Sequence, residues 1–280
     1  MAGYLVTTSM TSLSYKEASL DLLVDAERRF GSVDRAYGQV VTRLLDQSHI
    51  AVVGLGGVGS WAAEALARSG VGQLTLIDLD HVAESNINRQ VHALDATIGQ
   101  AKVLAMQSRI AQINPACVVR SIEEFVDADN VDELIPSTAD MVLDCTDQFS
   151  AKVAMVLCLR QRQRGLIVCG AAGGKTDALS LRFGDLRDST HDPLLARLRS
   201  TLRKQHGFAG VQAKRTPRMG VNVLWFEQPG HRPAGVVRGH ANSAPLACAG
   251  YGSLVTVTAA MGLAAAGRAL DWLIRGQPGR

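Results

Sequence analysis

Gly54-Leu55-Gly56-Gly57-Val58-Gly59 is the stretch of sequence that decides the fold. It follows an apolar run at 49–53, which is typical of a buried parallel strand, and precedes an Ala- and Leu-rich run at 60–69 that favours a helix. Glycines at such a turn let the backbone approach a ligand, and the helix N-terminus offers free N–H groups to a phosphate. The pattern predicts a nucleotide-binding α/β domain. The glycines expected at the nucleotide are Gly54, Gly56, Gly57 and Gly59.

Strand and helix patterns alternate along the rest of the chain, which predicts a doubly wound, Rossmann-like and mostly parallel sheet. Further strands are expected at 73–77, 117–121, 140–144 and 166–169, and helices at 99–112, 130–135, 149–163 and 192–205. Residues 178–183 and 221–226 alternate apolar and polar positions, so we expect them to form an antiparallel extension.

The charge of the chain is unevenly distributed. Residues 193–280 hold 12 basic and 2 acidic residues, whereas residues 1–192 hold 17 basic and 24 acidic ones. A polyanionic partner such as nucleic acid and a solvated helix face with a basic loop explain this asymmetry about equally well. The candidate contacts to nucleic acid are Arg197, Arg199, Arg203 and Lys204.

Three parts are expected within one domain: a poorly ordered lead-in at 1–27, a nucleotide-binding core at 28–180, and a basic C-terminal extension at 181–280. The apolar stretch 244–263 carries no charged residue, but its weakly hydrophobic composition favours a buried C-terminal helix over a membrane span. The N-terminus lacks the pattern of a signal peptide. We therefore expect a cytoplasmic protein without membrane association.

The five cysteines are scattered and no two form a C-x-x-C pair. Neither a structural zinc site nor a disulfide framework is expected, which fits a reducing compartment. Cys248 precedes a small-residue helix and is a candidate reactive thiol, although a buried structural cysteine is the commoner case.

Charged residues follow the predicted strands, at the sheet edge where ligands bind in this class of fold. Asp78 lies 24 residues after Gly54, near the spacing of a ribose-binding carboxylate. Arg89 and Lys102 are suited to neutralising phosphate charge in a transition state, and Asp147 is suited to holding Mg²⁺ beside phosphates. No candidate hydride-handling site is present, so the mixture favours ATP chemistry over that of a dehydrogenase.

Several motifs now stand in a fixed order. They are Gly54-Leu-Gly-Gly-Val-Gly59, Asp78-x-Asp80, Ser85-Asn86-x-x-Arg89-Gln90, Gly99-Gln-Ala-Lys102, Ile113-Asn-Pro115 and Asp144-Cys-Thr-Asp147. The order resembles the ubiquitin-activating-enzyme-like adenylyltransferases over about residues 28–180. The resemblance implies that ATP and Mg²⁺ adenylate a carboxylate. It places Asp78 at the ribose, Asn86, Arg89 and Lys102 at the phosphates with Gln90 beside them, and Asp147 at Mg²⁺ and the triphosphate.

A narrower resemblance covers nearly the whole chain. Gly173-Gly-Lys-Thr-Asp177, Asp192-Pro-Leu194 with its basic helix, and the segment around Cys248 look like the tRNA threonylcarbamoyladenosine dehydratase branch. That branch implies an AMP-forming, ligase-type tRNA-modifying enzyme acting on the modified adenosine at position 37. The threonyl carboxylate would be adenylated, and the neighbouring carbamoyl group would close a ring and expel AMP. Because ring closure is intramolecular, proximity supplies much of the rate.

Two other functions stay open. One is an adenylyltransferase that activates the C-terminus of a ubiquitin-like sulfur carrier, against which the missing C-x-x-C pairs argue. The other is a non-catalytic nucleotide-binding or sulfur-relay partner protein, against which the presence of Arg89, Lys102 and Asp147 argues. Sulfur-relay proteins of a cysteine desulfurase system are candidate partners. The sulfur-carrier activators also place an Arg-x-x-Arg near the N-terminus that reaches the partner subunit's ATP. Here Arg29 is the candidate, with Arg35 as an alternative, and that role would require a homodimer. Whether a monovalent cation binds is an open question.

Overall fold

The computed structural model describes residues 25–208, 210, 217–231 and 251–276. Its centre is a seven-stranded sheet with the strand order β3-β2-β1-β4-β5-β7-β6. All neighbouring strands are parallel except β6 and β7, which are antiparallel. The strands are β1 His49–Val53, β2 Gln73–Ile77, β3 Val118–Ile122, β4 Met141–Asp144, β5 Gly165–Cys169, β6 Leu181–Asp185 and β7 Asn222–Phe226.

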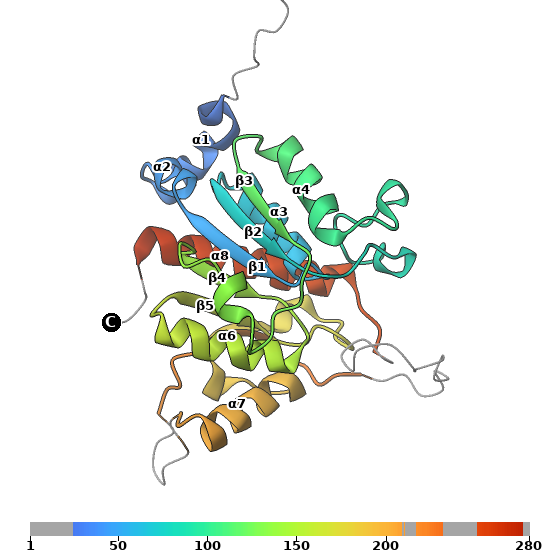
Figure 1. Ribbon diagram of the computed structural model, residues 1–280, viewed down its shortest axis with the longest axis vertical. Helices are drawn as coiled ribbons and strands as arrows, with labels where there is room; N and C mark the ends of the chain where they lie inside the picture. Colours follow the sequence, from blue (N-terminus) through green and yellow to red (C-terminus); the bar gives the residue numbers. More distant parts are fainter. Residues whose placement is uncertain (1–24, 209, 211–216, 232–250, 277–280) are drawn as a thin grey trace, which may run out of the picture.

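Helices cover both faces of the sheet, as the doubly wound prediction requires (Figure 1). One face packs against α3, α4 and α8, and the other against α5, α6 and α7. Strands β1 and β4 are buried along their whole length, which explains their uninterrupted apolar sequences. The helices are α1 Ala26–Tyr37, α2 Thr42–Asp46, α3 Gly59–Arg68, α4 Lys102–Ile113, α5 Val131–Leu134, α6 Phe149–Gln161, α7 Pro193–Gln205 and α8 Val255–Arg275.

The predicted fold class is confirmed, and the antiparallel extension differs in detail. Strand β7 pairs parallel to β5, so β6 alone runs against the other strands. Residues 178–180 form a 3-10 turn rather than strand, because the Asp177 carboxylate accepts a hydrogen bond from the Leu179 N–H and caps the turn. β6 therefore begins only at Leu181.

The start of α4 also differs from the expected helix at 99–112. Gly99 has a φ of +85°, and Ala101 forms a bridge with His81, so the chain becomes helical only at Lys102. Because the helix starts late, Lys102 is its first residue and lies beside the carboxyl ends of β1 and β2.

The C-terminal helix begins at Val255 rather than near 244, and residues 244–250 lie outside the described part of the chain. Among the described residues, α8 alone is long and apolar enough to cross a membrane by composition. Its residues Met261, Ala265 and Ala269 are buried in the core against the sheet and α3. A Cβ at Gly262 would collide with the Val58 carbonyl oxygen, so the small residues of α8 permit close contact with α3.

Candidate active site

A cavity of about 270 Å³ lies at the carboxyl ends of the central strands, which is where this fold class binds ligands. We call it the nucleotide cavity. The glycine loop after β1 forms one wall, and segments after β2, β4 and β5 form the others. The sequence-predicted residues on its surface are Gly54, Gly56, Gly57, Asp78, Asn86, Arg89, Gln90, Lys102 and Asp147.

The glycine loop is folded tightly against its neighbours. Gly54 has a φ of +86°, and a Cβ there would lie 2.8 Å from the Thr146 backbone nitrogen. A Cβ at Gly59 would collide with the Gly54 carbonyl oxygen, so glycine is required at both ends of the loop. The resulting turn brings the N-terminus of α3 to the cavity, where its N–H groups suit a phosphate.

Asp78 ties the loop to the end of β2. Its carboxylate accepts hydrogen bonds from the backbone N–H groups of Leu55 and Asp80, the latter at 2.8 Å. Burial raises the pKa of Asp78, while the Lys102 ammonium 3.9 Å away acts in the opposite direction. Each carboxylate oxygen can accept a second hydrogen bond, so Asp78 can still take a ribose hydroxyl.

The two expected phosphate-binding cations both lie at the cavity, but in different states. Lys102 is buried and its ammonium lies 2.7 Å from Asp80 Oδ2. Arg89 is half-buried and donates from Nη1 to the Ser85 carbonyl oxygen and to Asn88 Oδ1. The Trp61 indole N–H donates to the Arg89 carbonyl oxygen and so holds the backbone of this segment.

The amides of Asn86 and Gln90 are both buried in the wall. Asn86 Oδ1 accepts a hydrogen bond of 3.1 Å from the Ala83 N–H, which stabilises the turn Glu84–Asn86. Gln90 Oε1 is buried without a hydrogen-bond partner among the described residues. A buried acceptor without a partner is costly, so this oxygen fits a ligand donor in the cavity. Together with the glycine loop it makes the cavity suited to ATP.

Asp147 follows β4 and lines the nucleotide cavity one residue after Thr146, whose backbone packs against Gly54 of the glycine loop. The described residues contain no cluster of three or more His, Cys, Asp or Glu side chains arranged to hold a metal. A nucleotide-bound Mg²⁺ needs only one or two carboxylates in addition to phosphate oxygens and water. Asp147 therefore fits the carboxylate ligand of a Mg²⁺ that arrives with the triphosphate.

Among the predicted catalytic and nucleotide-binding residues, all of which lie in the described part of the chain, Gly59 and Arg29 do not line the nucleotide cavity. Arg29 lies in α1, donates to the Ile113 carbonyl oxygen at 2.8 Å and lines a separate surface cavity with Arg68 and Arg109. It does not line the nucleotide cavity of its own protomer. Cys248 lies outside the described residues.

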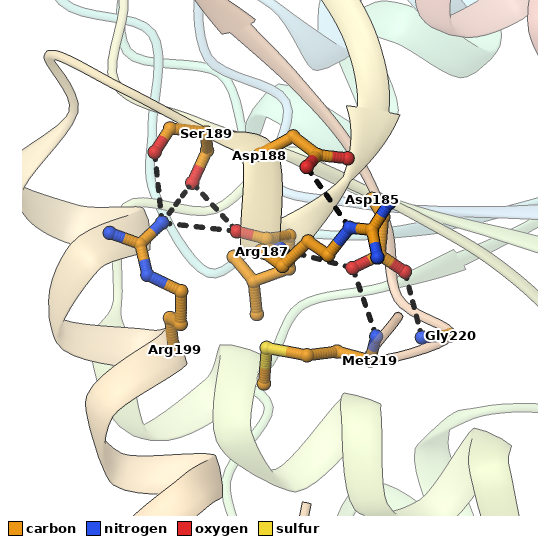
Figure 2. Close-up of polar contacts among 8 residues, drawn as sticks. Asp185, Arg187, Asp188, Ser189, Arg199, Met219 and Gly220 are labelled. Atoms are coloured by element: carbon orange, nitrogen blue, oxygen red, sulfur yellow. Dashed lines mark hydrogen bonds and ion pairs between the residues drawn. The ribbon is translucent and has the colours of Figure 1, made fainter. Parts of the chain in front are cut away.

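The basic side chains of helix α7 differ in their exposure to solvent. Arg199 turns inward, and its Nη1 donates to the carbonyl oxygens of Leu186 and Ser189 and to the Ser189 hydroxyl (Figure 2). Arg197 and Lys204 are exposed, and Arg203 is half-buried. Arg197 therefore faces outward with Lys204, whereas Arg199 fastens the helix to the preceding turn.

Sequence reasoning missed two features of the nucleotide cavity. Ser253 and Thr258 line it from the start of α8, and Thr258 touches Gly57. Beneath the site, the fully buried Lys152 ammonium lies 2.9 Å from Asp144 Oδ1 and donates to the Cys169 carbonyl oxygen. The hydroxyl residues Ser253, Thr256 and Thr258 at the start of the apolar C-terminal run were the available signal for the first feature.

The fold and the cavity define the class: an α/β protein with a glycine loop and a cavity at the carboxyl ends of its strands that is lined by Arg89, Lys102 and Asp147. A family model described as the ThiF family matches residues 32–279. The chain therefore belongs to the ThiF family.

Within this family the chain is similar to tRNA threonylcarbamoyladenosine dehydratases. It is 38% identical to the protein of that name from Haemophilus influenzae, over 89% of this chain and 94% of the relative. The solved structure of the Escherichia coli dehydratase TcdA in complex with ATP matches with a TM-score of 0.79 at 37% identity, covering 89% of this chain and 95% of that one. The molybdopterin-synthase adenylyltransferase of Salmonella typhimurium is 44% identical, but over only 39% of this chain and 43% of the relative.

Proposed function

We propose that this protein is an ATP-dependent tRNA threonylcarbamoyladenosine dehydratase. The observation that carries the proposal is that Arg89, Lys102 and Asp147 meet the glycine loop in one cavity. The similarity to dehydratases over nearly the full length of both chains supports the choice of substrate. The substrate is the N6-threonylcarbamoyl adenosine at position 37 of tRNA, and the product is its cyclic, dehydrated form.

The chemistry proceeds in two balanced steps. The threonyl carboxylate attacks the α-phosphorus of ATP, and pyrophosphate leaves. The carbamoyl group next to the activated carbonyl then attacks that carbon, loses a proton, closes the ring and expels AMP. The carboxylate oxygen that departs with AMP and the two hydrogens lost from the substrate account for the water removed.

The residues of the nucleotide cavity serve the first step. Asp78 holds the ribose and fixes the glycine loop, while α3 presents N–H groups to the phosphates. Arg89 and Lys102 stabilise the negative charge that develops on the transferred phosphorus and the leaving pyrophosphate. Asp147 would hold Mg²⁺, and the bound ion would further neutralise that charge.

A homodimer completes the site in this proposal. Arg29 lies away from the nucleotide cavity of its own protomer, so a phosphate contact by this residue requires a second copy. Exposed apolar side chains on α8 and beside the cavity, namely Ile87, Leu254, Val255 and Leu263, provide a surface for that copy. A cytoplasmic location and an interaction with a cysteine desulfurase system remain part of the proposal.

Activation of a ubiquitin-like sulfur carrier is the second candidate. The nucleotide cavity is compatible with it, because both reactions adenylate a carboxylate. The short match to molybdopterin-synthase adenylyltransferase and the missing C-x-x-C pairs argue against it.

AMP formation with defined RNAs separates these functions. The purified protein is incubated with Mg-ATP and either tRNA that carries threonylcarbamoyladenosine or the same tRNA transcribed without the modification. We expect AMP release only with the modified tRNA. AMP formation that requires a carrier protein and ignores the RNA modification would contradict the proposal.

A further inference from the structure

A second cavity, of about 1150 Å³, adjoins the nucleotide cavity. We call it the acceptor cavity. The two cavities share five lining residues, so a ligand in one can reach a ligand in the other across this boundary. The shared residues are Asp147, Gln148, Ala171, Gly173 and Leu194.

Buried charged groups fix the walls of the acceptor cavity. Lys175, in the loop after β5, is buried and donates to the carbonyl oxygens of His191 and Gln228. It thereby joins three segments that are distant in sequence. His191 has a φ of +55°, an uncommon conformation for a residue with a side chain, and Lys175 holds its carbonyl in place.

Asp192 fixes the boundary with the nucleotide cavity. Its buried carboxylate accepts the Ala171 N–H at 2.8 Å and caps α7 by accepting the Leu195 N–H at 3.0 Å. The loop after β5 and the start of α7 are therefore held together. The cavity is formed before any ligand arrives, which limits the ordering cost of binding.

The outer wall offers a flat cationic surface. The Arg197 guanidinium lies 3.9 Å from the centroid of the Phe149 ring, and both residues line the acceptor cavity. Unpaired RNA bases are commonly recognised by stacking on aromatic rings and arginine planes. The exposed Lys204 continues the positive charge along α7, where an RNA backbone could follow.

We propose that the acceptor cavity binds one modified nucleoside extruded from an RNA loop. Its carboxylate lies at the boundary near Asp147, and its base lies toward Arg197 and Phe149. This inference rests on the proposed function and names the site of its RNA substrate. Enzymes that act on a base commonly extrude it into a pocket, and the volume here exceeds that of typical small-ligand sites.

The test fills the cavity without touching the nucleotide site. Ala196 lies on α7, is exposed and lines the acceptor cavity but not the nucleotide cavity. Ala196→Trp is compared with Ser200→Trp, a matched exposed position one helical turn further along that does not line the cavity. The assay measures conversion of an anticodon stem-loop that carries threonylcarbamoyladenosine, beside ATP affinity and thermal stability.

We expect Ala196→Trp to lower kcat/KM for the stem-loop at least about tenfold, while ATP affinity and stability match those of Ser200→Trp. Equal kcat/KM in the two variants would overturn the assignment of the acceptor cavity as the nucleoside site, but it would not contradict the proposed function. An inactive wild type would contradict the proposed function instead.

Saturation-transfer NMR with the free nucleoside N6-threonylcarbamoyladenosine tests the cavity independently of turnover. A transfer signal on the threonyl methyl group in the wild type, lost in Ala196→Trp and kept in Ser200→Trp, supports the assignment. No signal in the wild type, or equal signals in both variants, would overturn it.

Discussion

At the scale of single residues, the nucleotide cavity is an arrangement of opposed charges. The Lys102 ammonium lies 2.7 Å from Asp80 Oδ2, and Arg89 donates to the Ser85 carbonyl oxygen in its own loop. A triphosphate offers both cations a stronger anion.

Asp147→Asn tests the metal ligand. We expect a loss of AMP formation of about 100-fold or more, because a neutral amide holds Mg²⁺ poorly and less charge is neutralised in the transition state. Asp129→Asn removes an exposed carboxylate outside the nucleotide cavity and should leave the rate unchanged. Similar rates for the two variants would show that Asp147 has no such role.

His92 should make stability depend on pH. It is 1% exposed, and burial together with the Lys102 and Arg109 charges lowers its pKa to about 4. Between about pH 6.5 and 4 the unfolded chain takes up this proton and the folded chain does not, so the free energy of unfolding falls as the pH decreases. Integrated over that window, the contribution is on the order of 3 kcal/mol.

Urea unfolding across that pH range measures the effect. His92→Phe removes the group, and neither ring nitrogen has a hydrogen-bond partner among the described residues, so an apolar ring can replace it. The variant should show a shallower pH dependence than the wild type. An unchanged slope would mean that His92 titrates normally.

At the scale of secondary-structure elements, the contact between α3 and α8 connects the core to the glycine loop. Gly262 approaches the Val58 carbonyl, and the Thr258 side chain lies 3.0 Å from the Cβ position of Gly57, closer than ordinary van der Waals contact. Helix α8 therefore supports the loop from behind and also contributes Ser253 and Thr258 to the cavity surface. A disturbance of this contact should reach the nucleotide.

Gly262→Ala should destabilise the protein by about 1–3 kcal/mol, because the added methyl group collides with backbone. Gly267→Ala lies in the same helix with no heavy atom within 4 Å of its Cβ position, and should stabilise it by about 0.5–1 kcal/mol. Urea unfolding measures both, and ATP affinity should weaken in Gly262→Ala alone. Equal effects would show that the close approach does not matter.

The sequence predicts the helices and strands of this protein better than it predicts which of them lie side by side. Apolar runs predict β1, β2 and β4. Asp192 followed by Pro193 predicts the start of α7, and the Asp192 carboxylate caps that helix. The parallel direction of β7 cannot be predicted from its sequence, because it depends on which strand lies beside β7 in the sheet. The Lys102–Asp80 pair and the part of α8 in the cavity wall were missed for the same reason, since both depend on tertiary contacts.

At the scale of the whole molecule, the nucleotide cavity, the acceptor cavity and the exposed charges of α7 follow one another in space. The two cavities share a boundary, and Arg197 lies both on α7 and in the acceptor wall. In the proposed function these regions bind ATP, the modified nucleoside and the RNA backbone. The basic character of the C-terminal part of the sequence is then explained by its partner.

Lys204→Gln tests the RNA backbone contact. Because Lys204 is exposed on α7, we expect the variant to bind tRNA more weakly. The slope of the logarithm of the binding constant against the logarithm of the salt concentration should decrease in magnitude by about one. Arg120→Gln removes an exposed cation from the opposite edge strand β3 and should change neither value. Fluorescence anisotropy at several salt concentrations provides the measurement, and identical slopes for both variants would place the tRNA elsewhere.

The most direct measurement of the central claim is mass spectrometry of nucleosides from threonylcarbamoyladenosine-bearing tRNA after incubation with this protein and Mg-ATP, with neutral work-up to preserve the ring. The account predicts that this nucleoside loses the mass of one water and that AMP appears in equal amount. An unchanged nucleoside, with protein that demonstrably binds ATP, would contradict it.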